Sequence, residues 1–233
     1  DELVISSTRG GGRQQLYIIN PVTNEVVHQL TDNGFENRHP SWGYNHATGE
    51  SVIVYTSDRT GSTQLYLIEP NGNNDLQIGN LDPNLNCRYP SFSPDLEEIA
   101  FQSVVSGIFV LNRDSGIVRQ LTELGDGEHP VWGMSFDIGN DIGDLIRIYF
   151  SSNVFNWNDF EIYTIRPDGT DRRNKTNKPF TSERWPLLSI QEELLFYSLR
   201  GEIGGFYKLN FLGEEQRLLG DRWHARLNSN YIE

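Results

Sequence analysis

The segment Arg88-Tyr89-Pro90-Ser91-Phe92-Ser93-Pro94-Asp95 is followed closely by Ile99-Ala100-Phe101-Gln102-Ser103, and this pair of motifs decides the fold because it recurs along the chain. Similar apolar runs end at Ser7, Ser57, Ser152 and Ser198. Successive serines of this set are 50, 46, 49 and 46 residues apart. A spacing of about 40–50 residues is typical of the blades of a β-propeller, so the sequence predicts an all-β repeat protein.

Each unit contains further predicted strands in a fixed order. The second strand covers 16–20, 65–69, 108–112, 162–166 and 206–210, with an aromatic residue always in its second position, at Tyr17, Tyr66, Phe109, Tyr163 and Tyr207. A turn rich in Asn, Asp, Pro and Gly leads to a third strand, and these residue types favour tight hairpins. The fourth strand contains the proline motif, at 38–42, 88–92, 129–132 and 184–188.

The number of proline motifs predicts how the ring closes. Four copies precede units two to five, and a degenerate fifth copy near 223–230 ends the chain. If this tail supplies the strand that the first unit lacks, the two chain ends share one blade and no sheet edge stays open. We therefore predict one domain over 1–233, a single five-bladed β-propeller of four-stranded antiparallel blades. Its units are about 1–38, 39–87, 88–128, 129–184 and 185–222, with a closing strand at 223–230.

A family resemblance agrees with this prediction. The motif at 90–95, together with Tyr55-Thr56-Ser57-Asp58-Arg59 and Leu65-Tyr66-Leu67-Ile68, resembles the TolB-type β-propeller repeat, and the resemblance covers the whole chain. It implies an inner strand that begins at the proline motif and lines a central channel. It also implies a periplasmic or secreted protein that binds other proteins, or a propeller carried beside a catalytic or membrane domain. The periplasmic TolB protein has six blades and a separate N-terminal domain, so its particular partner is not carried over to these five units.

Composition excludes several functions. The chain has 32 acidic and 19 basic side chains, a net charge of −13, which argues against general affinity for nucleic acid or anionic membranes. Its single cysteine, Cys87, excludes a disulfide framework and multi-cysteine metal sites. No apolar run approaches the roughly 18 residues that a membrane helix needs. The usual hydrolase, metalloprotease, phosphate-loop and dinucleotide motifs are absent from the sequence.

The few cations recur at one position of the repeat. Arg38, Arg88 and Arg184 stand two residues before the motif proline, and His39 and His129 stand one residue before it. Aromatic residues accompany them, and we predict that the set forms a cationic, aromatic-rimmed channel mouth for an anionic ligand or an acidic peptide. The candidate ligand-binding residues are Arg38, His39, Arg88, Tyr89, His129, Arg184, Trp185, Trp223, His224 and Arg226. The alternative is that each arginine pairs internally with an acid such as Glu36, Asp58, Asp126, Glu128 or Glu183.

Other residue clusters give weaker expectations. No cofactor or transition metal is expected, because histidines from different blades would have to converge on one ion. Loop oxygen donors leave calcium open as an alternative, at Asp137, Asn140, Asp141 and Asp144, or at Asn156, Asn158 and Asp159. The repeated aromatic residues, with Trp42, Phe92 and Trp132, are predicted to pack between blades. Trp157 lies outside the repeat pattern and is a candidate exposed contact.

Three functions are compatible with the sequence. The leading one is a non-enzymatic, extracytoplasmic, monomeric binding module, either alone or within a larger protein, that recognises a protein or peptide at the channel mouth. The second is a glycoside hydrolase or uronate lyase, which needs carboxylates facing across the channel. Its candidates are Glu36, Asp95, Glu128 and Glu183, predicted to lie in turns or beside arginines. The third is a purely structural spacer whose cations are fully paired.

Overall fold

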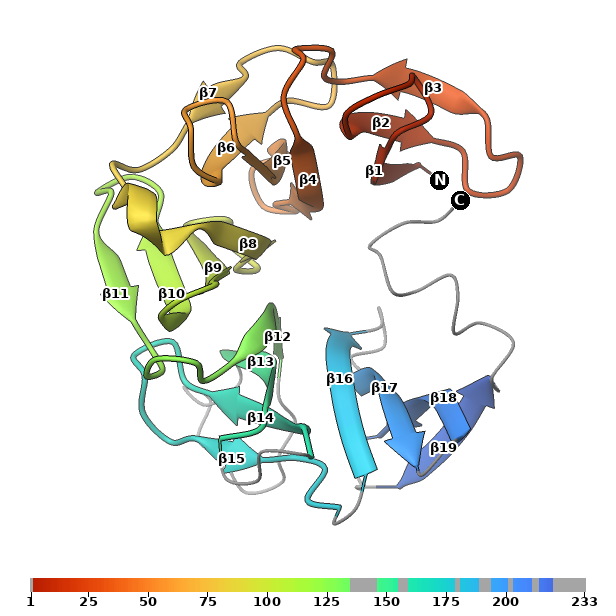
Figure 1. The fold of residues 1–233 in the computed structure, drawn as a ribbon, viewed down its shortest axis with the longest axis vertical. Coiled ribbons are helices and arrows are strands. Elements are labelled where there is room, and N and C mark those ends of the chain that lie inside the picture. The colour runs from red at the N-terminus through yellow and green to blue at the C-terminus, as the bar shows by residue number, and fades with distance from the viewer. Residues whose placement is uncertain are drawn as a thin grey trace.

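A computed structural model describes residues 2–134, 146–154, 159–178, 181–188, 194–200, 203–210 and 214–219. In these ranges the chain forms five antiparallel sheets arranged in a ring around a central axis (Figure 1). The protein is therefore an all-β, five-bladed β-propeller, as the repeat predicted. The helical content of the described residues is one 3₁₀ turn, Pro83–Leu85.

Each sheet is one blade, and its strands follow the chain as a meander. Blade 1 contains β1 (Leu3–Ser7), β2 (Gln15–Ile19) and β3 (Val26–Gln29). Blade 2 contains β4 (Asn37–Tyr44), β5 (Ser51–Ser57), β6 (Gln64–Ile68) and β7 (Leu76–Gln77). Blade 3 contains β8 (Cys87–Phe92), β9 (Glu98–Ser103), β10 (Gly107–Asn112) and β11 (Val118–Gln120). Blade 4 contains β12 (Glu128–Met134), β13 (Ile146–Ser152), β14 (Glu161–Ile165) and β15 (Arg173–Asn174). Blade 5 contains β16 (Thr181–Leu188), β17 (Leu194–Arg200), β18 (Ile203–Leu209) and β19 (Glu215–Leu219).

The proline motifs lie on the innermost strands. Strands β4, β8, β12 and β16 face the axis, and the remaining strands of each blade follow outward in order (Figure 1). Blade 1 has three strands among the described residues, and the predicted closing strand at 223–230 lies outside them. Closure of the ring by the C-terminal segment therefore stays a prediction.

The core consists of apolar layers between neighbouring blades. One layer joins blades 1 and 2 through residues such as Ile18 and Tyr55, and further layers join blades 2 to 3, 3 to 4 and 4 to 5. The aromatic residue of each second strand is buried in this core, at Tyr17, Tyr66, Phe109, Tyr163 and Tyr207. The predicted packing between blades is confirmed for Tyr66, Phe109, Tyr163 and Tyr207, which belong to the layers between neighbouring described blades. Tyr17 packs in a cluster within blade 1. Within the described residues, no helix has the length and apolar character that spanning a membrane requires.

Candidate functional site

A repeated backbone distortion directs side chains toward the axis. In β4, β8, β12 and β16 the pairing register shifts at the proline motif, so each inner strand has a β-bulge there. Proline has no N–H to donate to the ladder, which makes the bulge the natural place for it. The residue before the proline adopts a left-handed backbone in all four strands, with φ of 51° at His39, 48° at Tyr89, 53° at His129 and 54° at Trp185.

These four residues form the aromatic arc, a row of ring contacts that crosses blades 2 to 5. The ring centroids of His39 and Tyr89 are 4.2 Å apart, and those of Tyr89 and His129 are 3.9 Å apart. His129 meets Trp185 edge-on at 6.1 Å, and Trp185 meets Tyr197 at 5.4 Å. The structure thus brings together four predicted site residues that lie about one repeat apart in the sequence.

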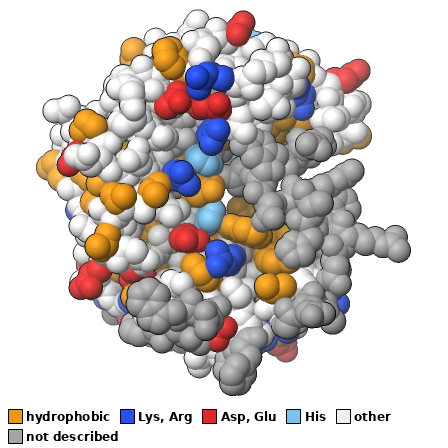
Figure 2. All heavy atoms as spheres, in the orientation of Figure 1, with side chains coloured by type: hydrophobic (Ala, Val, Ile, Leu, Met, Phe, Trp, Pro, Cys, Tyr) orange, Lys and Arg blue, Asp and Glu red, His pale blue; other side chains and the backbone are white. Residues whose placement is uncertain are grey.

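Three arginines stand immediately before the arc and differ in their partners. Arg38 Nη2 lies 3.1 Å from Glu36 Oε2, and the Arg38 side chain is 44% exposed. Arg184 Nη1 lies 3.6 Å from Glu128 Oε2 of the neighbouring blade, and the Arg184 guanidinium lies 3.4 Å from the centre of the Phe160 ring. Arg88 is exposed, and no carboxylate of the described residues lies within ion-pair distance of it. Figure 2 shows lysine or arginine side chains and histidines gathered at the centre of this face.

The alternative, that the mouth arginines pair internally with acids, therefore holds for two of these three arginines. Arg38 and Arg184 have the glutamates Glu36 and Glu128 as partners, as that alternative expected. The other three acids named for internal pairing contact residues other than the mouth arginines. Asp58 lies 3.8 Å from Arg13, Asp126 pairs with Arg172, and Glu183 accepts a hydrogen bond from Ser198. Arg88 remains the cation that internal pairing does not explain.

Burial and the arginines keep both histidines of the arc neutral. Burial lowers the pKa of His39 to about 3, and the charges of Arg88, Arg38 and His129 act in the same direction. Burial also lowers the pKa of His129 to about 3, with Arg184 and Arg88 as the next causes. The mouth therefore takes its positive charge from guanidinium groups at ordinary pH.

Hydrogen bonds fix the orientation of one histidine and leave the other incomplete. Thr56 Oγ1 donates to the Arg38 carbonyl oxygen at 3.1 Å, so His39 Nδ1–H donates to Thr56 Oγ1 at 3.0 Å. His129 Nδ1 is buried and has no hydrogen-bond partner among the described residues. Such an atom costs free energy unless a proton donor or acceptor reaches it.

Some predicted site residues lie outside the described part of the chain. This applies to Trp223, His224 and Arg226 at the mouth, to Trp157, and to the calcium candidates Asp137, Asn140, Asp141, Asp144, Asn156 and Asn158. In the described residues, no group of three or more His, Cys, Asp and Glu side chains is placed to hold a metal ion. Cys87 is buried, and burial raises the pKa of its thiol to about 12, so it is an inert core residue.

The four candidate catalytic carboxylates are each engaged locally. Asp95 lies in a turn, where it accepts hydrogen bonds from Ser93 Oγ at 2.5 Å and from the backbone N–H of Glu97. Glu183 directly precedes Arg184, in agreement with the expectation that these carboxylates lie in turns or beside arginines. Glu183 lies in β16, buried, with Oε1 2.7 Å from Ser198 Oγ, and burial raises its pKa. Glu36 and Glu128 are the partners of the mouth arginines.

A second set of arginines was missed by the sequence reasoning. Arg9, Arg59 and Arg200 lie over the rings of Tyr17, Tyr66 and Tyr207, with guanidinium carbons 5.3, 3.7 and 4.0 Å from the ring centres. Each follows the repeated serine by two residues, so the signal is a Ser-x-Arg pattern in units one, two and five. In blade 4, Arg172 covers Tyr163 from a different part of the blade, at 4.3 Å. These cation–π contacts hold the second-strand aromatic residues in place.

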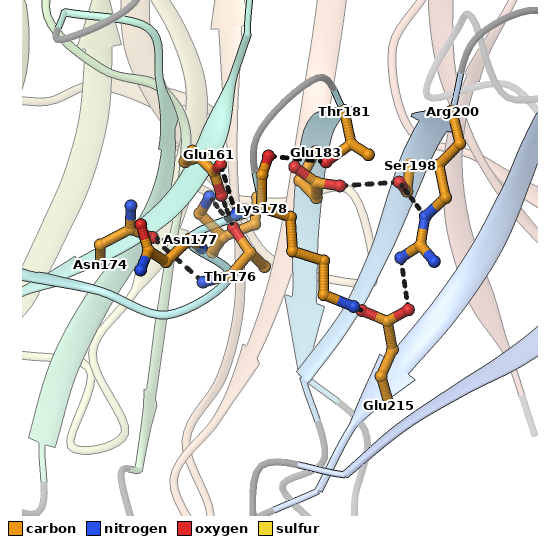
Figure 3. Close-up of polar contacts among 11 residues, drawn as sticks. Glu161, Asn174, Thr176, Asn177, Lys178, Thr181, Glu183, Ser198, Arg200 and Glu215 are labelled. Atoms are coloured by element: carbon orange, nitrogen blue, oxygen red, sulfur yellow. Dashed lines mark hydrogen bonds and ion pairs between the residues drawn. The ribbon is translucent and has the colours of Figure 1, made fainter.

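One polar network links blades 4 and 5 (Figure 3). Glu215 of β19 accepts hydrogen bonds from Lys178, which follows β15, and from Arg200 of β17. Arg200 Nε also donates to Ser198 Oγ at 3.1 Å, and Ser198 donates to Glu183. The network bridges two blades, and its acids and cations bind one another, which is a structural arrangement.

Comparison with known proteins supports the fold. No protein-family model and no curated protein sequence matches the chain. TolB from Acinetobacter baumannii aligns with 94% of this chain at a TM-score of 0.72 and 17% identity, and the chain spans 52% of that protein's length. A second TolB-type propeller, from Agrobacterium tumefaciens, gives a TM-score of 0.67 at 16% identity over 94% of this chain and 81% of the other. Oligogalacturonate lyase from Vibrio parahaemolyticus gives 0.62 at 12% identity over 94% and 62%.

The fold and its repeated inner strand therefore define the class of protein. The chain is a β-propeller, and its solved structural neighbours include TolB-type propellers. The repeat resemblance predicted this fold.

Proposed function

We propose that this protein is a non-enzymatic binding module that holds an acidic segment of a partner protein at the mouth of its central channel. The carrying observation is Arg88, an exposed guanidinium between His39 and His129 without a carboxylate partner among the described residues. Arg38 and Arg184 each have one glutamate, so Arg88 adds an uncompensated positive charge to the mouth of a chain whose net charge is −13.

The chemistry of the mouth suits carboxylates. A guanidinium presents a fork of donors that matches a carboxylate with two parallel hydrogen bonds. The rings of Tyr89 and Trp185 lie beside these donors and are fixed by the bulged backbone, so they offer contact area at a small cost in side-chain entropy. The combination supports recognition of an acidic peptide segment rather than of a metal or a nucleic acid.

The structural neighbours support a protein partner in an extracytoplasmic setting. They include two TolB-type propellers and a structure of the nidogen/laminin complex, which has a TM-score of 0.64 at 13% identity over 94% of this chain and 78% of the other. We extend to this chain the extracytoplasmic location and the protein-binding role that the TolB-type resemblance implies. The proposed partner is defined by a segment rich in Asp or Glu side chains.

The enzymatic alternative has less support. The neighbouring oligogalacturonate lyase acts on an anionic saccharide, and a uronate carries the same carboxylate that the arginines would bind. However, the four candidate carboxylates of the described residues are each held by an arginine or by a local hydrogen bond. A glycosidase needs two carboxyl groups facing one substrate, roughly 5–10 Å apart.

A direct binding measurement tests the proposal. Fluorescein-labelled hexaglutamate is titrated with the wild-type protein and with Arg88→Ala, and binding is followed by fluorescence anisotropy. We expect the wild type to bind hexaglutamate and not hexalysine, and Arg88→Ala to bind about tenfold more weakly, because one charge-assisted contact is worth about 1.4 kcal/mol or more. Arg166→Ala is the matched control, since Arg166 is a 40% exposed arginine that pairs with Asp171 in the outer part of blade 4.

Equal affinity of the wild type and Arg88→Ala would refute the proposed site. Trigalacturonate in the same titration separates the two ligand classes. If trigalacturonate displaces hexaglutamate and is cleaved to an unsaturated product that absorbs ultraviolet light, the protein is a uronate lyase and the binding-module proposal fails.

A further inference from the structure

We infer that the acidic segment held at the mouth continues into aliphatic residues, which dock on an apolar strip over the tops of blades 3 and 4. The apolar strip consists of Val104, Val105, Leu124 and Val154. This inference rests on the proposed function, because it names the chemistry of the same partner beyond its acidic part.

The repeat itself supplies the reason to single out the strip. The residue two positions after the repeated serine is arginine in units one, two and five, where it covers an aromatic ring. In units three and four that position holds Val105 and Val154 instead, with side chains 45% and 42% exposed. In blade 3 the valine replaces a ring-covering arginine, whereas in blade 4 Arg172 covers the Tyr163 ring from another part of the blade. In both blades the valine leaves an exposed aliphatic side chain.

The members of the strip lie next to one another. Val104 and Val105 form the hairpin between β9 and β10, and Gln120 Nε2 donates to the carbonyl oxygen of Ser106 in that hairpin at 2.6 Å. A Cβ on Gly107 would lie 2.5 Å from the carbonyl oxygen of Glu123, so the loop that carries Leu124 packs directly against the hairpin. Leu124 is 77% exposed and Val104 is 44% exposed.

A groove connects this loop to blade 4. It has a volume of about 600 Å³ and is lined in part by Glu123, Val154, Ile165 and Leu121. Val154 therefore borders the same hollow as the loop of Leu124. A strip of aliphatic side chains beside a groove of this size can take the side chains of an extended peptide.

The strip is continuous with the cationic mouth. Arg88 of β8 pairs with Gln102 of β9, and the hairpin begins directly after Ser103. Gln102 Oε1 also accepts a hydrogen bond from the backbone N–H of His129 in the arc. A segment whose carboxylates reach Arg88 therefore leaves the mouth across Val104 and Val105. The four residues of the strip are aliphatic, and Arg172, the arginine that lines the groove, is paired with Asp126. The continuing residues of the partner are therefore aliphatic rather than acidic.

A selection from random peptides displayed on phage tests the inference with the intact chain. Four proteins are compared: the wild type, Val105→Arg with Leu124→Ser, Arg88→Ala, and Val22→Arg. Val105→Arg places over Phe109 the arginine that other blades already carry, so the double variant is expected to unfold at the same temperature as the wild type or higher. Val22 is 90% exposed in the turn after β2 and outside the strip, so Val22→Arg controls for adding a surface charge.

We expect the wild type and Val22→Arg to enrich peptides that combine Asp or Glu with Leu, Ile, Val or Met. The double variant should keep the acidic preference and lose the aliphatic one, and it should bind a synthetic peptide of the enriched class about tenfold more weakly, as expected when buried aliphatic contacts are lost. Equal aliphatic enrichment in the wild type and the double variant would overturn the strip. Acidic enrichment that survives Arg88→Ala would overturn the proposed function instead, and no enrichment by the wild type would overturn both.

Discussion

The residue before the motif proline carries the main local feature of this protein. His39, Tyr89, His129 and Trp185 all have left-handed backbones, which cost roughly 1–3 kcal/mol each in a residue other than glycine. These four strained residues occupy equivalent positions and their rings are in contact, which indicates that the strain serves the same structural role in each blade. The bulge gives up ladder hydrogen bonds to aim these rings at the axis.

The strain at Tyr89 leads to a first prediction. Both Tyr89→Ala and Tyr89→Gly remove the ring, but only glycine is free of strain at φ 48°. Tyr89→Gly should therefore be more stable than Tyr89→Ala by about 1 kcal/mol, measured by urea unfolding. At an ordinary strand position the glycine variant is the less stable of the two. A lower stability of Tyr89→Gly than of Tyr89→Ala would therefore contradict the left-handed backbone at this residue.

The neutral His129 leads to a second prediction, on pH. Its pKa is about 3 in the folded protein and about 6.5 in an unfolded chain, so only the unfolded state takes up the proton as the pH falls below about 6.5. The free energy of unfolding should then decrease on acidification from about pH 6.5 toward pH 3, by at most about 1.4 kcal/mol per pH unit from this group.

Urea unfolding at pH 7 and pH 5 checks this sign. His129→Phe should lose less stability between the two pH values than the wild type, and His46→Asn in an exposed turn should behave as the wild type. The comparison cancels the contributions of Glu161 and Glu183, whose pKa burial raises. An identical loss in His129→Phe and the wild type would mean that the pKa of His129 is the same in the folded and unfolded proteins, which would contradict its lowering by burial.

At the scale of the elements, the strands were largely predictable from the repeat. The second strand of unit two was predicted at 65–69 and lies at Gln64–Ile68, and the inner strand of unit three was predicted at 88–92 and lies at Cys87–Phe92. Period-two patterns and turn residues carry this information locally. The bulges were not predicted, because histidine, tyrosine and tryptophan give no sign of a left-handed backbone.

The site was predictable in composition but not in pairing. The spacing before the proline selected Arg38, Arg88 and Arg184 together. Which of them has no carboxylate partner among the described residues depends on acids contributed across blades, as in the contact of Arg184 with Glu128. The sequence alone does not show which acid of a neighbouring blade lies beside which arginine.

The hairpin of blade 3 leads to a third prediction. Gly107 has φ 102°, and a Cβ there would lie 2.5 Å from the Glu123 carbonyl oxygen and 2.6 Å from Thr122 Oγ1. Gly107→Ala should therefore destabilise the protein by more than about 2 kcal/mol. Gly116, with φ 68° and open space around it, is the matched control, and Gly116→Ala should cost about 1 kcal/mol. Equal losses in urea unfolding would contradict the close packing of the hairpin against the 121–127 loop.

At the scale of the whole molecule, the ring depends on contacts between blades. Apolar layers join each described pair of neighbouring blades, and polar bridges such as Lys178 to Glu215 add to them between blades 4 and 5. Each blade is stable only with its neighbours, which is the general behaviour of repeat architectures.

The bridge gives a fourth prediction. Glu215 has a largely buried side chain and binds both Lys178 and Arg200, so Glu215→Gln leaves two partly buried cations without a charge partner. We expect a loss of about 1–2 kcal/mol, reduced from the value for a fully buried pair because both cations are partly exposed. Glu97→Gln, an exposed change, should cost nothing measurable. A neutral Glu215→Gln in urea unfolding would mean that the apolar layer alone joins the two blades.

At this scale the central claim is our proposal that the channel mouth of the ring binds an acidic segment and that Arg88 holds it. Charge reversal tests this site most directly: the affinity of labelled hexaglutamate is measured for the wild type and for Arg88→Glu under the same salt and pH, with unfolding midpoints recorded for both. We predict that Arg88→Glu folds as the wild type does and binds hexaglutamate more than tenfold more weakly. An unchanged affinity in a folded Arg88→Glu protein would contradict an acidic-segment site at the mouth.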